Sequence, residues 1–255
     1  MSENKQPPGG RLPKIREQPI PGGFFVCEGE NVKTAILVDG GFYRKRAAFL
    51  WGKKTPEERA KELYSYCLMH LDYERKYEQR SLYRIFYYDC PPLAKTMYHP
   101  LLQKGIDFRK KETYLWANEF FEQLKKQRKV ALRMGELSDD FATFTISPTA
   151  LKEICAGKKN ISDLTEKDFR PAVTQKGVDM KIGIDIASLA YKKEVDQIIL
   201  IAGDSDFVPA AKLARREGID FILDPMWADI KPSLFEHIDG LRSMRKKDVK
   251  RDSAE

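Results

Sequence analysis

Four short apolar segments, each separated from the next by stretches with helical periodicity, constrain the fold of this chain more than any other feature. They are residues 34–38 (TAILV), 82–88 (LYRIFYY), 197–202 (QIILIA) and 218–223 (GIDFIL). Short β-branched or aromatic runs that alternate with helices are typical of parallel strands joined by crossover helices. Residues 105–109 are a fifth and weaker strand candidate. The alternation predicts an α/β fold.

The helices expected between these strands have recognisable ends. Thr55 is followed by Pro56 and two glutamates, which is typical of a capped helix start, and Gly218 is typical of a helix end. Residues 111–175 interrupt the rhythm, apart from a basic helical stretch at 116–129, and we interpret them as an insertion on one edge of the sheet. The expected crossover helices cover residues 55–71, 92–103, 178–191 and 207–217.

The two ends of the chain differ in composition from the middle. Residues 1–30 hold five of the 14 prolines, which predicts an extended or disordered arm over residues 1–32. The folded domain is expected over residues 33–240, and residues 241–255 form a charged tail.

Charge is distributed unevenly along the sequence. The net charge is +7, with +10 in residues 1–133, −6 in residues 134–240 and +3 in the tail. Lys and Arg side chains neutralise phosphates, so the basic part favours a polyanionic partner such as nucleic acid, although a solvated surface is the alternative interpretation.

Several classes of protein are disfavoured by the composition. The longest apolar run, residues 198–202, is far shorter than the ~20 residues of a membrane-spanning helix. The N-terminal residues contain no apolar core of a secretory signal, so we expect a cytoplasmic protein with no membrane span. The four cysteines lack the spacing of a zinc site or a disulfide framework and are expected to be reduced thiols.

Aspartates stand at the ends of three predicted strands. Asp39 follows AILV, Asp89 follows IFYY and Asp204 follows ILIAG. The carboxyl ends of parallel strands form one rim of a sheet, where ligands bind. Carboxylates gathered there repel one another unless a cation holds them, and such hard oxygen donors suit Mg²⁺ or Mn²⁺. The alternative is that each aspartate only caps the helix that follows.

The first aspartate is followed by two glycines, in the motif VDGGF. Glycine lets the backbone approach a ligand closely, although this is neither a P-loop nor a dinucleotide-binding fingerprint. Arg44, Lys45 and Arg46 come next and are candidates for binding phosphate, or else they form a solvated helix face.

The second motif, GDSDF, places Asp204 and Asp206 two residues apart at a strand-to-helix turn. Asp204 lies nearer the strand and is the expected metal ligand. Asp206 is expected to cap the helix or to accept a hydrogen bond from an attacking water, with Ser205 as a supporting candidate.

A third segment, KGVDMKIGID, opens a helix with Asp179 in its first turn. An acid there is also favoured by the helix dipole, by ~0.3–1 kcal/mol, which is the alternative explanation. Asp185 lies six residues on, about 120° away around the helix at 3.6 residues per turn, so it is only a supporting or structural candidate. Lys176, just before the helix, is expected to position a backbone phosphate.

Three motifs together carry a family resemblance: VDGGF, KGVDMKIGIDIASLA and IAGDSDFVPAAKLARREGI. Over residues 33–240 the chain resembles the NYN domain, the PIN-like nuclease family that includes the LabA-like proteins. The resemblance implies a three-layer, Rossmann-like sandwich around a mostly parallel sheet. It also implies a rim of aspartates that binds divalent metal and hydrolyses RNA. Carried over by position, the family's acidic residues are Asp39, Asp179, Asp204 and Asp206, with Asp89 as a supporting candidate.

The resulting hypothesis is a metal-dependent ribonuclease, with endonuclease action favoured over exonuclease action. Asp39, Asp179 and Asp204 would hold one or two Mg²⁺ or Mn²⁺ ions, which lower the pKa of a bound water. The substrate is expected to be single-stranded RNA, with a base stacked on an aromatic side chain. The stacking candidates are Phe42, Tyr43 and Tyr88, the last of which is equally plausible as a core residue.

Other interpretations remain open on the sequence. Histidine-pair catalysis is unsupported, because His70, His99 and His237 lie outside the acidic motifs. A catalytically inactive RNA-binding or regulatory protein of the same fold is the main alternative. A haloacid dehalogenase-type phosphatase is disfavoured, since it needs a second aspartate where this chain has Gly41. The oligomeric state is open, with a homodimer as one candidate.

Overall fold

The structure is a computed structural model that describes residues 31–73 and 79–244. These residues belong to a compact unit that begins at Asn31. Most of the expected arm (residues 1–30) and of the expected tail (residues 245–255) lie outside the described residues, while Asn31 and Val32 open the first strand. The domain boundaries drawn from the sequence stay predictions.

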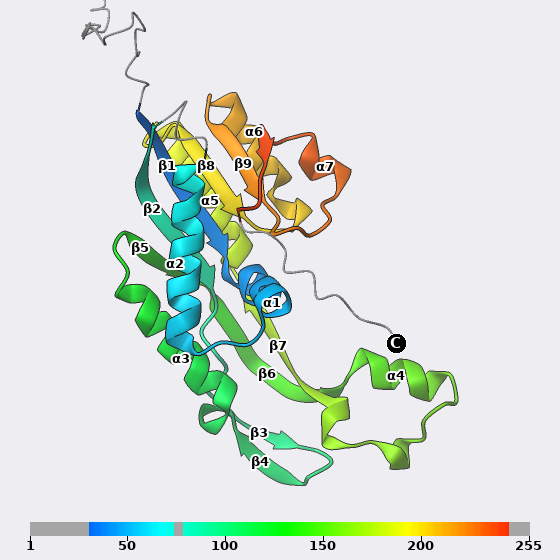
Figure 1. Cartoon of the computed structure of the whole chain (residues 1–255). Coiled ribbons are helices and arrows are strands. Elements are labelled where there is room, and N and C mark those ends of the chain that lie inside the picture. The colour runs from blue at the N-terminus through cyan, green and yellow to red at the C-terminus, as the bar shows by residue number, and fades with distance from the viewer. Residues whose placement is uncertain (1–30, 74–78, 245–255) are drawn as a thin grey trace, which may run out of the picture. The chain divides into compact units, whose positions relative to one another are not determined.

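The core of this unit is a six-stranded, all-parallel sheet with the strand order β10-β9-β8-β1-β2-β5 (Figure 1). All four main strand predictions are confirmed as β1, β2, β8 and β9, whereas β5 and β10 were not anticipated. The strands are β1 (Asn31–Asp39), β2 (Gln79–Asp89), β5 (Val130–Met134), β8 (Gln197–Ile201), β9 (Asp220–Asp224) and β10 (Gly240–Leu241).

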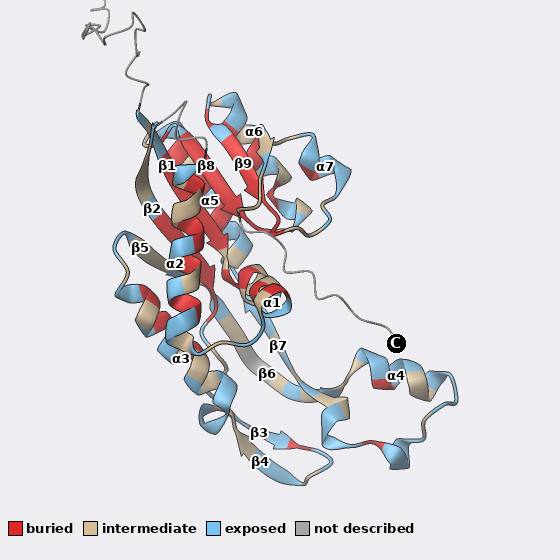
Figure 2. Ribbon diagram, in the orientation of Figure 1, coloured by how far each residue is buried: buried red, intermediate tan, exposed pale blue. Residues whose placement is uncertain are grey.

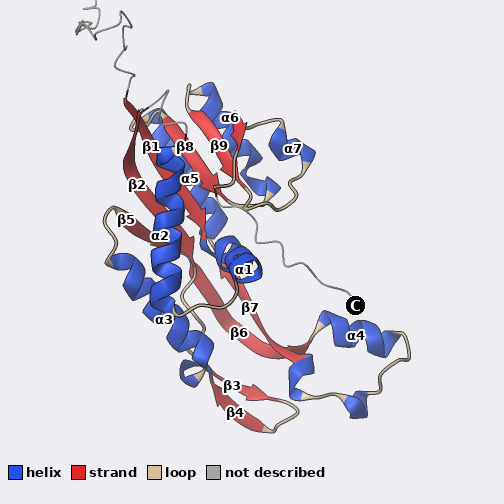
Figure 3. Cartoon of the chain, in the orientation of Figure 1, coloured by secondary structure: helices blue, strands red, loops and turns tan. Residues whose placement is uncertain are grey.

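Helices cover both faces of the sheet and make a three-layer sandwich, as the resemblance implied (Figure 3). One layer holds α1 (Gly40–Trp51), α2 (Pro56–Asp72) and α3 (Glu112–Lys125), and the other holds α5 (Val178–Tyr191), α6 (Val208–Arg216) and α7 (Pro232–Phe235).

Strand residues alternate between the two layers. Ile36 and Val38 pack under α1, α2 and α3, whereas Ala35 and Leu37 pack under α5 and α6, and all four are fully buried. Burial on both faces explains why β1 and β8 are continuous apolar runs (Figure 2). Each buried Val, Leu or Ile contributes about 1.5–3 kcal/mol.

The predicted helix ends are also present. Thr55 and Glu58 form a capping box at the start of α2, and Pro56 occupies the first turn. Gly218 follows α6 with φ +83°, a left-handed conformation that glycine adopts without strain.

Two antiparallel pairs lie outside the central sheet. β3 (Thr96–His99) pairs with β4 (Lys104–Asp107). β6 (Glu136–Ile146) pairs with β7 (Phe169–Lys176), and α4 (Pro148–Cys155) lies in the connection between them. The short 3₁₀ segments η1 (Phe108–Lys110), η2 (Ile161–Asp163) and η3 (Glu166–Asp168) complete this part of the chain.

The expected crossover helix at residues 92–103 is wrong. Residues 96–99 form β3, in which Met97 and His99 are buried while Tyr98 is exposed, so the pattern has the period of a strand. The fifth strand candidate exists as β4, but it pairs with β3 and not with the central sheet.

The segment that departs from the sandwich is shorter than expected. α3 belongs to the helical layer and β5 pairs with β2 at the edge of the central sheet, so residues 112–134 are part of the sandwich. Residues 136–176 form the β6–β7 arm, by which we mean β6, α4, η2, η3 and β7.

Aromatic side chains join the β3–β4 pair to the β6–β7 arm. The His99 ring lies 4.4 Å from Phe144 and 5.1 Å from Phe169, centroid to centroid, and Phe108 lies 5.9 Å from Phe144. These contacts form a small second core that anchors the arm to the rest of the chain.

Cys67, Cys90 and Cys155 carry free thiols, as expected, and Cys27 lies outside the described residues. In the part of the chain that the structure describes, no helix combines the length and the apolar character needed to cross a membrane.

Candidate active site

The order of the strands points to the carboxyl ends of β1 and β8 as the place where a ligand would bind. From β1 the chain proceeds to β2 and β5 in one direction along the sheet, whereas β8 is followed by β9 and β10 in the other. In an open parallel sheet, ligands bind where the strand order reverses in this way. Asp39 is the last residue of β1, and Asp204 lies three residues beyond the end of β8.

The turn from β1 into α1 is held tightly against β2. The Asp39 carboxylate caps α1 by accepting the backbone N–H of Phe42 at 3.1 Å. A Cβ atom on Gly40 would lie 2.5 Å from the Tyr87 ring and 2.6 Å from the Tyr88 carbonyl oxygen. Only glycine fits at this position. Because Gly40 has no side chain, the turn can pack directly on β2, and this packing fixes the position of the neighbouring Asp39.

The turn after β8 packs on the turn after β1. A Cβ atom on Gly203 would lie 2.5 Å from the Phe42 ring. Asp204 then opens the 3₁₀ segment η4 (Ser205–Phe207), with its Oδ1 accepting the backbone N–H of Asp206 at 3.1 Å. The glycine contact therefore brings the GDSDF turn against the DGGF turn.

A third glycine joins the start of α5 to the same rim. A Cβ atom on Gly135 would lie 2.7 Å from the Lys176 carbonyl oxygen and 3.0 Å from the Cys90 thiol sulfur. Gly177 follows with φ +80°, and Asp179 stands in the first turn of α5.

The carboxylates influence one another electrostatically. Burial raises the pKa of Asp39, and the charges of Asp179 and Asp89 raise it further, against the backbone N–H groups of Phe42 and Gly41. Burial likewise raises the pKa of Asp179, with further contributions from Asp204 and Asp206. Carboxylates from three separate segments of the sequence therefore lie near enough at this rim to act on one another electrostatically.

We call Asp39, Asp179, Asp204 and Asp206 the carboxylate cluster. Among the residues that the structure describes, none of the four forms an ion pair with Lys or Arg. Uncompensated hard oxygen donors fit Mg²⁺ or Mn²⁺ in both charge and donor type. Within residues 31–73 and 79–244, however, no three His, Cys, Asp or Glu side chains stand close enough together to hold an ion.

Comparison with known proteins identifies the family. The model of the NYN domain matches residues 97–230, which include Asp179, Asp204 and Asp206. The chain belongs to the NYN domain family. This family is part of the PIN-like nuclease superfamily, so the resemblance seen in the sequence is confirmed.

Individual relatives of this NYN domain are distant. An uncharacterized protein of Methanocaldococcus jannaschii is 26% identical over 96 residues, which are 37% of this chain and 40% of that protein. The match thus spans less than half the length of that curated relative.

Solved structures show weaker likeness. A protein of unknown function from Vibrio parahaemolyticus has a TM-score of 0.44 at 12% identity, over 87% of this chain and 98% of its own. The nicotinamidase of Staphylococcus aureus has a TM-score of 0.29 at 12% identity, over 81% and 89%. These TM-scores are too low for either structure to bear on the chemistry of this NYN domain.

The two supporting aspartates are each paired with arginine. Asp89 is buried and accepts the Arg44 guanidinium at 2.9 Å. Asp185 accepts Arg133 through both oxygens, at 2.9 and 3.0 Å, and the Tyr88 hydroxyl at 2.8 Å. The charges of both supporting aspartates are therefore compensated by arginine, and Asp89 lies near enough to Asp39 to act on it electrostatically.

The four predicted phosphate-binding residues have different environments. Arg44 is already paired with Asp89, and Arg46 donates to the Met226 carbonyl oxygen at 2.6 Å. Lys45 and Lys176 are exposed. The two lysines are therefore the members of the set whose charge faces solvent, and phosphate binding by all four stays a prediction.

Two of the three stacking candidates are wrong. Tyr43 and Tyr88 are fully buried in the two opposite core layers, so neither presents a ring face to a ligand. Phe42 is partly buried, with its ring packed against Gly203. The Ser205 hydroxyl accepts the Lys231 ammonium at 3.0 Å, so this supporting candidate holds the turn to the segment before α7.

Sequence reasoning missed one buried carboxylate at the same rim. Asp224 ends β9 and is fully buried, where it accepts the Tyr66 hydroxyl at 2.5 Å, the His70 ring at 2.9 Å and the Ser243 hydroxyl at 2.7 Å. The signal was present, because Asp224 directly follows the apolar FIL of a predicted strand. Its partners fix α2 and the residues after β10 to the sheet, which is a structural role.

Proposed function

We propose that this NYN domain hydrolyses phosphodiester bonds of single-stranded RNA at the carboxylate cluster, with Mg²⁺ or Mn²⁺ as cofactor. The observation that carries the proposal is that four carboxylates from three separate segments lie at the reversal of strand order. Burial, with a smaller contribution from neighbouring carboxylates, raises the pKa of Asp39 and Asp179 there. None of the four has a Lys or Arg partner within the described residues.

Each member of the cluster has a distinct part in the proposed reaction. Asp39, Asp179 and Asp204 would hold the cation, which requires their side chains to draw closer together than they stand in the structure. A bound cation would supply a water of lowered pKa and would stabilise negative charge on the phosphate. Asp204 already uses Oδ1 to accept the Asp206 N–H, which orients its carboxylate. The Asp39 carboxylate is oriented in the same way by the N–H of Phe42.

Asp206 is the proposed acceptor of the proton from the attacking water. Water oxygen bonds to phosphorus, the bond from phosphorus to one ester oxygen breaks, and that ester oxygen takes a proton from solvent. Lys45 and Lys176, both exposed, bind the neighbouring phosphates. Attack within a strand needs no free end at the cluster, so the proposal is an endonuclease.

One observation favours a second candidate, RNA binding without turnover. Asp39 and Asp204 each satisfy backbone N–H groups at the start of a helix or 3₁₀ segment. A protein that had lost catalysis would still keep these aspartates as caps.

Cleavage of a labelled circular single-stranded RNA tests the proposal. The wild-type protein is incubated with and without Mn²⁺, beside Asp204→Asn and the matched charge-loss variant Glu217→Gln. Glu217 follows α6 and lies just before the amino end of β9, whereas the cluster lies at the carboxyl ends of the strands. Cleavage is expected only with Mn²⁺, unchanged in Glu217→Gln, and at least about 100-fold slower in Asp204→Asn, or roughly 2.7 kcal/mol.

The same experiment separates the candidates. Cleavage without a divalent cation, or at an undiminished rate in Asp204→Asn, would contradict the proposed chemistry. RNA binding by the wild type without cleavage under any condition would support the non-catalytic candidate. If the circle stays intact while a linear RNA of the same sequence, incubated in parallel, is shortened, the protein acts as an exonuclease and not as an endonuclease.

A further inference from the structure

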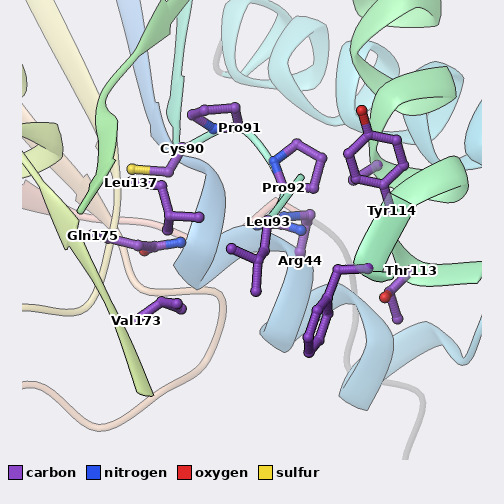
Figure 4. A pocket seen from close by; sticks show the side chains of 12 residues that line it. Arg44, Cys90, Pro91, Pro92, Leu93, Thr113, Tyr114, Leu137, Val173 and Gln175 are labelled. Carbon is purple, nitrogen blue, oxygen red and sulfur yellow. The ribbon is translucent and has the colours of Figure 1, made fainter. Parts of the chain in front are cut away.

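A cavity of about 220 Å³ lies between the sandwich and the β6–β7 arm, and its walls include Arg44 and Cys90, which both hydrogen-bond to Asp89. Figure 4 shows Leu137, Val173 and Gln175 of the arm on one side and Thr113 and Tyr114 of α3 on the other. Pro92, Leu93 and Arg44 lie between these two sides. The cavity therefore exists because the arm leaves the sheet at this point.

The walls carry apolar and polar groups but no free charge. Leu93, Phe108, Leu137 and Val173 supply apolar surface, and among the residues that the structure describes no carboxylate lines the cavity. Arg44 is the single charged group in the wall, and its guanidinium is paired with Asp89 at 2.9 Å. A neutral and largely flat group suits these walls better than a phosphate does.

Short covalent and hydrogen-bonded links connect the cavity to the cluster. Gln175 in the wall is four residues before Asp179. Cys90, also in the wall, donates its backbone N–H to the Asp89 carboxylate at 2.8 Å, and Asp89 acts electrostatically on Asp39. These links are the basis for expecting that an RNA strand with a phosphate at the cluster can extend a neighbouring base towards the cavity.

The size of the cavity limits what it can hold. Sites for drug-sized ligands have volumes of roughly 300–1,000 Å³, so this cavity suits one base better than a whole nucleotide. The Tyr114 ring is only partly buried and offers a face for stacking. The Gln175 side chain offers an amide donor and acceptor, which together can read the edge of a base.

We propose that this cavity is a nucleobase-binding subsite that selects the base next to the cleaved phosphodiester. Tyr114 stacks on the base and Gln175 reads its edge. This inference rests on the proposed function for its substrate class, since it takes single-stranded RNA as the ligand.

Binding tests the subsite independently of cleavage. Fluorescence anisotropy is measured in EDTA, which prevents turnover, with labelled eight-nucleotide poly(A), poly(U) and poly(C) and with an otherwise identical strand of abasic ribonucleotides. The proteins are the full-length wild type, Tyr114→Ala, Gln175→Leu and two controls outside the cavity, Tyr191→Ala on exposed α5 surface and Gln127→Leu after α3.

The wild type is expected to prefer one base and to bind the abasic strand weakly. Tyr114→Ala should weaken binding of the preferred strand about tenfold and leave the abasic strand unchanged. Gln175→Leu should reduce the discrimination among bases while retaining binding. Tyr191→Ala and Gln127→Leu should behave as wild type.

The outcomes distinguish failure of the subsite from failure of the proposed function. Equal effects of Tyr114→Ala on the abasic and base-containing strands, or unchanged base preference in Gln175→Leu, would overturn the subsite even if the circular RNA is cleaved. Loss of base preference in the variants, without cleavage by any protein, would uphold the subsite and reject the nuclease. A far-ultraviolet circular dichroism spectrum identical to that of the wild type excludes misfolding of either variant.

Discussion

At the scale of single residues, the buried pair of His70 and Asp224 links the stability of this NYN domain to pH. Burial lowers the pKa of His70, and the Asp224 carboxylate opposes that shift without cancelling it. In the unfolded chain, His70 takes up a proton below about pH 6.5. In the folded chain it does so only at lower pH, so the folded state binds fewer protons in this window and loses stability as the pH falls.

The variant His70→Leu measures this contribution. At pH 7.5 it should be about 1.5–3 kcal/mol less stable than the wild type, because a hydrogen bond to a charged group is lost. The difference in the free energy of unfolding should narrow towards pH 5.5. There, His70 of the wild type takes up a proton more readily in the unfolded chain than in the folded one, so the wild type loses stability while the variant does not. Urea-induced unfolding at several pH values gives both numbers, and a difference that stays constant or widens would contradict the assignment.

A second substitution separates the hydrogen bond from the titration. His70→Gln keeps a donor towards Asp224 but takes up no proton. We expect a smaller loss of stability at pH 7.5 than in His70→Leu, with the same narrowing at lower pH.

For single residues, the sequence predicted which aspartates are candidates for the site, but it did not predict which side chains surround them. The four cluster aspartates could be singled out because each follows an apolar strand or opens a helix. The partners of Asp89 and Asp185 could not, because Arg44 and Arg133 are brought to them by packing between elements that are distant in the sequence. The roles proposed for the cluster stay predictions until they are measured.

At the scale of elements, the contact between Gly203 and Phe42 fixes how closely the two turns of the cluster approach. In Gly203→Ala the added methyl group would lie 2.5 Å from the Phe42 ring, so either that ring or the turn that carries it must shift. We expect a loss of about 1–3 kcal/mol in the free energy of unfolding, as for other overpacked sites, and a loss of cleavage. Chemical denaturation and the circular-RNA assay measure the two effects.

Two further variants control for the effect of the methyl group itself. Gly183→Ala lies in α5 with open space around the added atom, and it should stabilise the protein by about 0.5–1 kcal/mol through helix propensity. In the double variant Gly203→Ala/Phe42→Ala the clash is absent, so Gly203→Ala should cost less there than in the wild type. An equal cost in both backgrounds would show that the ring contact is unimportant.

The elements that the sequence predicted correctly are those buried in the sandwich. β1 and β8 each contain an uninterrupted apolar run, residues 35–38 and 198–201, because both faces are covered there, and such runs need no tertiary information to be recognised. β5 escaped notice because its sequence, VALRM, contains an arginine that pairs with Asp185. The strand β3 was mistaken for helix because its buried residues, Met97 and His99, depend on the arm for their burial.

At the scale of the whole molecule, the net charge of +7 is the sum of a basic part, residues 1–133, an acidic part, residues 134–240, and a basic tail, and this uneven distribution bears on RNA binding. In the predicted phosphate-binding set, Arg44 is paired with Asp89, whereas Lys45 and Lys176 are exposed. For single strands, each phosphate neutralised contributes about −0.7 to the slope of log K against log salt concentration. The double variant Lys45→Ala/Lys176→Ala should therefore make that slope shallower by about 1.4.

Anisotropy titrations at a series of salt concentrations check this value. The matched double variant Lys192→Ala/Lys212→Ala removes the same number of positive charges from two exposed positions. Lys192 follows α5, and Lys212 lies in α6. It should leave the slope unchanged. Equal changes in both double variants would show that the whole surface, and not the rim beside the cluster, attracts the RNA.

The β6–β7 arm begins and ends on neighbouring positions, since Glu136 pairs with Lys176. A glycine stands on either side of this pair, Gly135 before β6 and Gly177 after β7. The two ends of the arm therefore lie side by side where they join the sandwich, as the two ends of a β-hairpin do. This junction does not depend on the length or sequence of the residues between Glu136 and Lys176. We therefore expect that the arm can be replaced by one of different length or sequence without moving the carboxylate cluster. Because the arm supplies one wall of the cavity, such a replacement would alter which base the cavity accepts.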